Sequence, residues 1–194
     1  MKVRDSGMPE EQLWESFFNP ELIIERLFGS RLDGNAAEFG CGYGTFTPEI
    51  ARRTNGRLYA FDIEEEMIQK VKGRVKDLSN VEVLLRDLEN EGTGLEDESV
   101  QSVALFNILH GHDPLRLLKE AYRIMPEGGK IAVIHWNYDP STPRGPEMSI
   151  RPKPEDIQLW MKKAGFGVSP VIDLPPYHYG ITGIKVKSKG SSRL

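Results

Sequence analysis

The sequence lacks most of the features that mark secreted, membrane-spanning or nucleic-acid-binding proteins. It has one cysteine, Cys41, in 194 residues, so no internal disulfide can form and a cytoplasmic location is expected. No run approaches the ~18 apolar residues that span a bilayer. Residues 1–18 carry charges throughout and lack the apolar centre of a signal peptide. The net charge of −4 favours neither a nucleic acid nor a membrane surface as partner.

What the sequence does contain is a regular alternation of apolar runs with helix-period segments. A chain of this length suits one domain, and the alternation predicts a doubly wound α/β fold with a mostly parallel sheet. The five expected parallel strands lie at residues 35–40, 57–63, 81–87, 99–109 and 128–136.

The pattern changes after Trp136. Residues 137–154 hold five prolines in eighteen positions, which predicts an irregular loop over one end of the sheet. A helix is expected next, followed by two terminal strands at 168–174 and 178–187. The polar residues 188–194 are expected to fray.

Three alternate glycines follow the first expected strand, at Gly40, Gly42 and Gly44. Such a turn lets a ligand lie against bare backbone at the carboxyl end of a parallel sheet. A dinucleotide fingerprint would place another glycine where Thr45 stands, and a phosphate loop would add a lysine. Glu38, just before the glycines, would repel a phosphate and attract a cation.

Two further acids end neighbouring strands. Asp62 follows the second expected strand, where a carboxylate can accept both hydroxyls of a ribose. Asp87 follows the third, where it can accept from an exocyclic amine. For each acid taken alone, a helix cap or a solvated strand end is the favoured interpretation. Together with Glu38 they favour a ligand with amines, a ribose and an adenine but no phosphate, and S-adenosyl-L-methionine is such a ligand.

The motifs resemble those of the Rossmann-like, class I S-adenosylmethionine-dependent methyltransferases, particularly small-molecule methyltransferases of the quinone-biosynthesis type. The likeness runs from about residue 27 to residue 187, and Asn107 stands where several members have aspartate. It implies seven strands, the last antiparallel. The segments that carry it are EFGCGYG, AFDIEEEMI, LLRDLE, SVALFNILHGHDP and LLKEAYRIMPEGGKIAV.

This resemblance implies roles at the glycine-rich turn. The backbone of Gly40, Cys41 and Gly42 would lie along the methionine and the ribose. Glu38 would orient the amino-acid end, and Asn107 with its carbonyl would face the methionine ammonium.

The same resemblance places the adenosine beyond the turn. Asp62 would take the ribose diol, and Ile63 would lie against the adenine. Asp87 would accept from the adenine amine, while Leu88 would pack on the ring or donate through its backbone.

Methyl transfer needs alignment and water exclusion more than it needs a catalytic group. A general base is required only if the nucleophile holds its proton tightly. His110 and His135 are the candidates, since both fall at the ligand end of the sheet, and for each a packing role is an equally good interpretation. His110 and His112 would face apart on a strand, so no metal site is predicted.

The acceptor pocket is expected between the N-terminus and the loop after the fifth strand. Met8, Trp14, Phe17 and Phe18 are too apolar for a free tail, and residues 1–28 are interpreted as a lid on a methyltransferase domain spanning 29–187. Packing on the sheet edge is the alternative. Arg144 and Arg151 could bind an anionic acceptor, but anchoring of the Pro-rich loop is favoured. The expected pocket residues are Trp14, Tyr43, Trp136 and Tyr138.

Transfer of a methyl group to a small-molecule acceptor is therefore the leading functional hypothesis. A non-catalytic S-adenosylmethionine-binding regulatory module explains the same motifs. An NAD-dependent oxidoreductase is disfavoured by Thr45 and Glu38. The acceptor and the oligomeric state stay open.

Overall fold

Residues 8–187 are described in the computed structural model of the chain. Within them, one sheet holds eight strands, in the order β3-β2-β1-β4-β5-β8-β6, with β7 also pairing with β8. The strands are β1 Ala36–Phe39, β2 Leu58–Asp62, β3 Val81–Leu85, β4 Ser102–Phe106, β5 Lys130–Trp136, β6 Phe166–Val168, β7 Ile172–Leu174 and β8 His178–Lys185.

The first five strands are parallel, as the alternation of strands and helices predicts. β1 pairs with β2 on one side and with β4 on the other. The order in which successive strands are added to the sheet therefore reverses at β1. β8 runs antiparallel to β5. The predicted fold class, a doubly wound and mostly parallel sheet with an antiparallel final strand, is confirmed.

The expected strand at 168–174 differs in detail. It is replaced by two short strands, β6 and β7, both paired antiparallel with β8. Pro170 lies between them, and proline cannot donate a backbone hydrogen bond to a ladder. Strand pairing therefore stops at Val168 and resumes at Ile172, which divides the expected strand in two.

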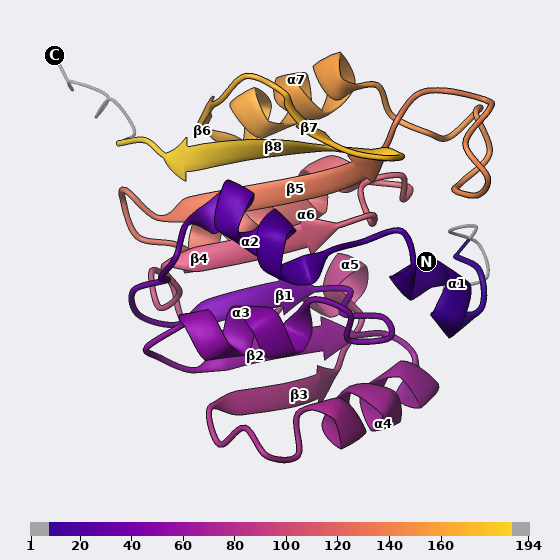
Figure 1. Cartoon of the computed structure of the whole chain (residues 1–194). Coiled ribbons are helices and arrows are strands. Elements are labelled where there is room, and N and C mark those ends of the chain that lie inside the picture. Colours follow the sequence, from indigo (N-terminus) through magenta and orange to yellow (C-terminus); the bar gives the residue numbers. More distant parts are fainter. Residues whose placement is uncertain (1–7, 188–194) are drawn as a thin grey trace, which may run out of the picture.

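Helices cover both faces of the sheet (Figure 1). α2, α3 and α4 lie on the face turned to the viewer, and α5, α6 and α7 lie behind it. Five of these six helices begin within two residues of a proline, an asparagine or an aspartate that fits a helix start. The helices are α1 Glu11–Glu15, α2 Pro20–Phe28, α3 Thr47–Arg53, α4 Glu65–Arg74, α5 Leu88–Glu91, α6 Pro114–Ile124 and α7 Pro154–Ala164.

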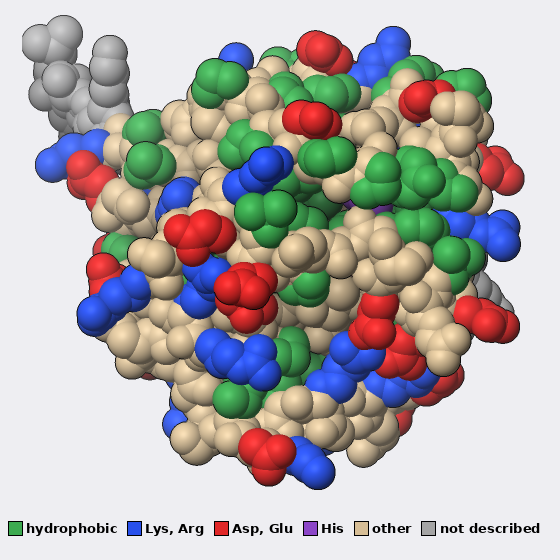
Figure 2. All heavy atoms as spheres, viewed as in Figure 1, with side chains coloured by type: hydrophobic (Ala, Val, Ile, Leu, Met, Phe, Trp, Pro, Cys, Tyr) green, Lys and Arg blue, Asp and Glu red, His purple; other side chains and the backbone are tan. Residues whose placement is uncertain are grey.

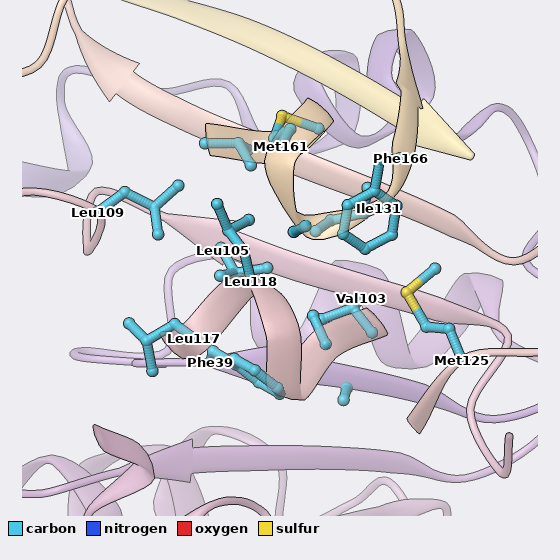
Figure 3. Close-up of a cluster of buried hydrophobic side chains, with 14 of the residues drawn as sticks. Phe39, Val103, Leu105, Leu109, Leu117, Leu118, Met125, Ile131, Met161 and Phe166 are labelled. Atoms are coloured by element: carbon cyan, nitrogen blue, oxygen red, sulfur yellow. The ribbon is translucent and has the colours of Figure 1, made fainter. Parts of the chain in front are cut away.

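β4 explains why the core has two sides. All five of its residues are buried, because helices pack on both faces and side chains alternate along a strand. Ala104 and Phe106 pack with α2 and α3 residues. On the other face Figure 3 shows the larger cluster, whose labelled side chains include Phe39, Val103, Leu105, Leu117, Leu118, Ile131, Met161 and Phe166.

The N-terminal segment divides into two parts with different packing. In α2, Ile24 and Leu27 are fully buried against the sheet. α1 instead lies at the carboxyl ends of the parallel strands, on the right in Figure 1. Residues 1–7 and the expected frayed tail 188–194 lie outside the described residues. From residue 8 to residue 187, no helix has the length and apolar character needed to cross a bilayer.

Candidate cofactor and acceptor site

A cavity lies at the carboxyl ends of β1 to β5, under α1. Parallel sheets present their ligands at this edge, close to the strand where the order reverses. Its lining brings together residues that are far apart in the sequence and were predicted as site residues: Trp14, Glu38, Gly40, Cys41, Gly42, Asp62, Ile63, Asp87, Leu88, Asn107, His110 and Trp136.

The glycine-rich turn brings bare backbone to this cavity. Gly40 and Gly42 have φ angles of 71° and 52°, in the left-handed region that favours glycine. A Cβ on Gly40 would lie 2.6 Å from Ile108 Cγ2, so a side chain is excluded there. A Cβ on Gly42 would have only Met8 atoms near it, at 3.7 Å, and would project into the space above the turn.

Glu38 is almost completely buried at the end of β1, with 2% of its surface exposed. Thr47 Oγ1 donates to its Oε2 at 2.6 Å. Burial raises the pKa of Glu38 to about 8, against the lowering effect of this hydrogen bond. The carboxyl group is thus protonated at neutral pH until a cation lies close to it.

Asp62 connects β2 to the glycine-rich turn. Its Oδ2 accepts the backbone N–H of Gly42 at 2.8 Å, and its Oδ1 accepts the N–H of Glu64 at 3.0 Å. Burial raises the pKa of Asp62, while these backbone donors act in the opposite direction. A carboxylate has about four lone-pair positions, so each oxygen can still accept from a ligand hydroxyl.

Asp87 combines a cavity position with a helix cap. Its Oδ1 accepts the backbone N–H of Asn90 at 3.1 Å, at the start of α5, and its Oδ2 accepts Asn90 Nδ2 at 2.8 Å. These hydrogen bonds lower the pKa of Asp87. Beside it, Ile63 is 37% exposed at the cavity and Leu88 is buried. The cap seen here is the alternative that the sequence left open, and it does not use every lone pair of the carboxylate.

Asn107 carries an unusual backbone and an unpaired side chain. Its φ angle is 58°, and its backbone N–H donates to the Ile134 carbonyl at 2.8 Å. The residue is 7% exposed, yet neither Oδ1 nor Nδ2 has a hydrogen-bond partner among the described residues. Leaving such a group unpaired costs ~1–3 kcal/mol, and a polar ligand in the cavity would remove this cost.

His110 and His135 form a buried pair. Nδ1 of His110 lies 3.2 Å from Nε2 of His135. His110 lines the cavity, whereas His135 lies behind it and is fully buried. Burial lowers the pKa of His110 to about 4 and also lowers that of His135, so both rings are neutral at pH 7. Within residues 8–187 no three His, Cys, Asp or Glu side chains gather into a metal site.

α1 is held over the cavity by charged contacts with α4. Glu11 pairs with Lys70 at 2.8 Å and also with Arg74, which in turn pairs with Glu15. Acidic and basic side chains meet in this region at the lower right of Figure 2. Trp14 of the same helix lines the cavity and packs near Trp136, with ring centroids 6.2 Å apart.

Two predicted pocket residues do not line the cavity. Tyr43 packs beside α1, where its hydroxyl donates to the Pro9 carbonyl at 3.1 Å and Lys70 lies over its ring. Tyr138 is 44% exposed, and Lys153 lies over its ring.

Arg151 anchors the Pro-rich loop, as the sequence favoured. Its guanidinium is buried and donates to the carbonyls of Asn137, Asp139 and Pro146 and to Thr142 Oγ1. Arg144 is exposed.

Sequence reasoning missed several lining residues. Phe46, Phe106 and Leu117 contribute apolar surface. Met8, which the sequence assigned to the N-terminal lid, closes the cavity above the turn. Thr47 was also missed, although it is the hydrogen-bond partner of Glu38. The position of Phe106 at the end of an apolar strand was the one available signal. The others depend on how α6 and the start of α3 pack over the sheet.

These features fit S-adenosyl-L-methionine. The unpaired Oδ1 of Asn107 and the three carboxyl groups near the ends of successive strands provide acceptors for its ammonium, ribose and adenine amine. The missing side chain at Gly42 leaves room for the ligand against the turn. The cavity thus contains a set of polar groups that is incomplete without a ligand of this chemistry.

The comparison with protein families agrees with the geometry. A sequence model described as a methyltransferase domain matches residues 37–133, from the second residue of β1 to the fourth residue of β5. The fold and site therefore define a class I methyltransferase. The chain belongs to the S-adenosylmethionine-dependent methyltransferase family, whose cofactor is S-adenosyl-L-methionine, as the resemblance implied.

Individual relatives extend this result. A Streptomyces fradiae protein described as an uncharacterized 37.1 kDa protein in transposon TN4556 is 30% identical over 77% of this chain and 46% of its own length. Malonyl-[acyl-carrier protein] O-methyltransferase 1 of Ilyobacter polytropus is 31% identical over 54% of this chain and 38% of its own length. The chain spans about half the length of these curated relatives or less.

Solved structures agree on the fold. A SAM-dependent methyltransferase from Aquifex aeolicus superposes with a TM-score of 0.79 at 27% identity, covering 92% of this chain and 95% of that one. The [4+2]-cyclase SpnF superposes with a TM-score of 0.74 at 13% identity, over 94% of this chain and 87% of that one. The second match shows the fold alone. The narrower likeness to quinone-biosynthesis enzymes stays a prediction.

Proposed function

We propose that this protein binds S-adenosyl-L-methionine at the ends of β1, β2 and β3 and methylates a small-molecule acceptor. The observation that carries the proposal is the convergence of three carboxyl groups, one at or just after the carboxyl end of each strand, on a cavity floored by the glycine-rich turn. Bound S-adenosylmethionine supplies a methyl group already activated by a positively charged sulfur.

Different residues bind different parts of the cofactor. Glu38 and Asn107 face the amino-acid end, because a buried carboxyl with a raised pKa and an unpaired amide both gain from an ammonium. Asp62 accepts from the ribose while holding the Gly42 backbone in place. Asp87, Ile63 and Leu88 bind the adenine edge and faces.

The chain's contribution to rate is orientation and exclusion of water. Trp14 of α1 and Met8, which precedes that helix, cover the cavity, and Trp136 closes it at the end of β5. A cavity closed in this way favours a direct in-line encounter between acceptor and methyl group. It also favours a small acceptor, or a small group carried on a larger molecule, over a folded nucleic acid.

The alternatives make different predictions. An NAD-dependent oxidoreductase would need to place a pyrophosphate beside Glu38, where a buried acid disfavours it. A regulatory S-adenosylmethionine-binding module would use the same cofactor residues without turnover. The [4+2]-cyclase in the same fold illustrates that the fold alone does not define the reaction.

Calorimetry with S-adenosylhomocysteine and with NADH tests the proposal. S-adenosylhomocysteine should bind and raise the melting temperature, whereas NADH should do neither. Failure of S-adenosylhomocysteine to bind at millimolar concentration would refute it. Labelled S-adenosylmethionine, incubated with a metabolite extract, then separates an enzyme from a binding module, since only an enzyme transfers label to an acceptor.

A further inference from the structure

The cavity has a second half that the proposed cofactor contacts do not use. It lies at the ends of β4 and β5 and beneath α1, beside the three carboxyl groups of the cofactor half. We call it the acceptor half, and it is lined by Met8, Trp14, Phe106, His110, Leu117 and Trp136. Five of these six side chains are apolar or aromatic, so the body of the acceptor must be largely apolar.

The acceptor half offers no cation to an anionic substrate. Among the described residues that line the whole cavity, Arg86 is the only lysine or arginine. It follows β3 in the cofactor half, and its Nε donates to the Gly92 carbonyl at 2.7 Å. A carboxylate or phosphate buried against tryptophan and leucine would cost several kcal/mol in desolvation, and no side-chain cation of the acceptor half would offset this cost. The protein side of the acceptor half therefore favours an uncharged acceptor over an anionic one.

One polar group in the acceptor half lacks a partner. Nε2 of His110 is buried and makes no hydrogen bond among the described residues, although the residue is only 5% exposed. The opposite nitrogen, Nδ1, is 3.2 Å from His135 Nε2. An unpaired ring nitrogen in an apolar cavity marks the position where a ligand hydrogen bond is missing.

The pairing with His135 determines what Nε2 can do. Two neutral imidazoles that share one hydrogen bond place a single proton between them. If His110 Nδ1 donates, then its Nε2 is bare and accepts from a ligand. If His135 Nε2 donates instead, His110 carries its proton on Nε2 and can only donate. Low pKa values keep both rings neutral, so this choice exists at physiological pH.

We propose that the acceptor is an uncharged molecule with a hydroxyl group on an apolar body, that His110 Nε2 accepts the hydroxyl proton, and that His135 positions that proton-accepting tautomer. This inference rests on the proposed function. The lack of a lysine or arginine in the acceptor half disfavours an anion, and the apolar walls suit a ring or an alkyl chain. His110 would touch the substrate, whereas His135 acts only through His110.

The proposed step balances without a further reactant. As the hydroxyl oxygen takes up the methyl carbon, an oxygen lone pair forms the C–O bond, and the C–S bonding electrons return to sulfur. The O–H proton passes to His110 Nε2. The positive charge that leaves the sulfur thus reappears on the imidazole, and the cavity gains no net charge. Because the net charge of the cavity does not change, the imidazole, which is neutral in the free protein, can hold the proton until the methyl ether leaves.

Binding of simple probes tests the acceptor class separately from turnover. The protein is saturated with S-adenosylhomocysteine and titrated with phenol, toluene and benzoate. Phenol should bind more tightly than both. His110→Phe should lower phenol affinity about tenfold, to the level of toluene, without affecting S-adenosylhomocysteine binding. His112→Phe, at an exposed histidine two positions away, is the matched control and should change neither.

The outcomes separate the two proposals. If S-adenosylhomocysteine itself does not bind, the proposed function fails. If it binds but benzoate matches or exceeds phenol, or if His110→Phe leaves phenol binding intact, only the acceptor inference fails. An N-methylated product from a natural acceptor would also overturn it.

Nitrogen NMR of labelled histidines tests the role of His135, first in the wild type and then in two variants. In the phenol complex His110 should carry its proton on Nδ1 and a bare Nε2. A proton on Nε2 in this complex would overturn the proposal. His135→Leu should move the proton to Nε2 and weaken phenol binding, and His135→Gln, whose amide oxygen can accept from Nδ1, should restore both. A purely structural role for His135 would leave the tautomer unchanged.

Discussion

The backbone N–H of Gly42 donates to Asp62 Oδ2 at 2.8 Å, which connects the turn after β1 to the end of β2. Because one carboxylate both supports the turn and faces the cavity, the shape of the cofactor site and its polar contacts depend on the same residue. The hydrogen bond also lets Asp62 keep its negative charge at a buried position, against the desolvation that raises its pKa.

Asp62→Asn should weaken S-adenosylhomocysteine binding by about ten- to a hundredfold, since hydrogen bonds to a charged acceptor contribute ~1.5–3 kcal/mol. Calorimetry measures this change. Asp33→Asn, at a side chain that is 82% exposed, is the control and should bind normally. If Asp62→Asn bound S-adenosylhomocysteine with unchanged affinity, Asp62 would not be a ligand contact.

Gly42→Ala should reduce both stability and cofactor binding. The φ angle of 52° disfavours alanine by ~1–2 kcal/mol, and the added methyl group would project toward the cavity near Met8. Urea unfolding and calorimetry measure the two effects. Gly73→Ala, in α4 and with open space around the new Cβ, is the control and should stabilise by ~0.5–1 kcal/mol. Equal effects at both glycines would contradict the assignment.

Ligand affinity should rise with pH because of Glu38. Its pKa of about 8 in the free protein should fall when an ammonium lies beside it, so binding releases a proton. Affinity for S-adenosylhomocysteine should therefore increase as pH rises toward 8, by up to about tenfold per unit. Calorimetry in buffers of different ionisation enthalpy detects the proton. Glu38→Gln should bind without this pH dependence.

The same group affects the stability of the ligand-free protein. As pH rises from 4.5 toward 8, the unfolded chain loses the Glu38 proton before the folded protein does, so Glu38 contributes less stability over this interval. Glu38→Gln should flatten that part of the curve of unfolding free energy against pH. A stability that rises across this interval in the wild type but not in the variant would show the opposite linkage.

Arg74→Gln should loosen α1. The arginine pairs with both Glu11 and Glu15, so its loss leaves one lysine to hold the helix by charge. Hydrogen exchange at residues 11–16 should speed up roughly threefold, as expected for partly exposed ion pairs. High salt should produce the same change in the wild type and little more in the variant. Arg31→Gln, at an exposed pair outside this region, should have no effect on α1.

Arg151→Lys should destabilise the Pro-rich loop by about 2–3 kcal/mol, because an ammonium cannot reproduce the fork of guanidinium donors that satisfies its carbonyls. Hydrogen exchange across residues 137–151 and thermal unfolding report the change. The control is Arg144→Lys, an exposed position where stability should shift by less than ~0.5 kcal/mol. Similar losses in both variants would show that Arg151 is no special anchor.

Local pattern predicted the elements that carry the cofactor site. The strand ends at Phe39 and Asp62, the glycine-rich turn and the helix after Pro114 follow from burial periodicity and turn chemistry, which act over a few residues. The division of the expected strand at 168–174 around Pro170 was visible in the same terms but was not predicted. Tyr138 and Tyr43 were chosen for the pocket by proximity in sequence, and neither lines the cavity.

The sequence by itself determined the doubly wound sheet and the placement of acids and glycines at the ends of its strands. Alternation of apolar residues, turn formation and helix capping are local effects, so the sequence shows them directly. The tertiary structure decided the rest. It placed His135 behind His110, left the Asn107 amide unpaired and brought Trp14 over Trp136. Such contacts depend on the packing of segments 25 to more than 100 residues apart, and local residue preferences contain no information about those distances.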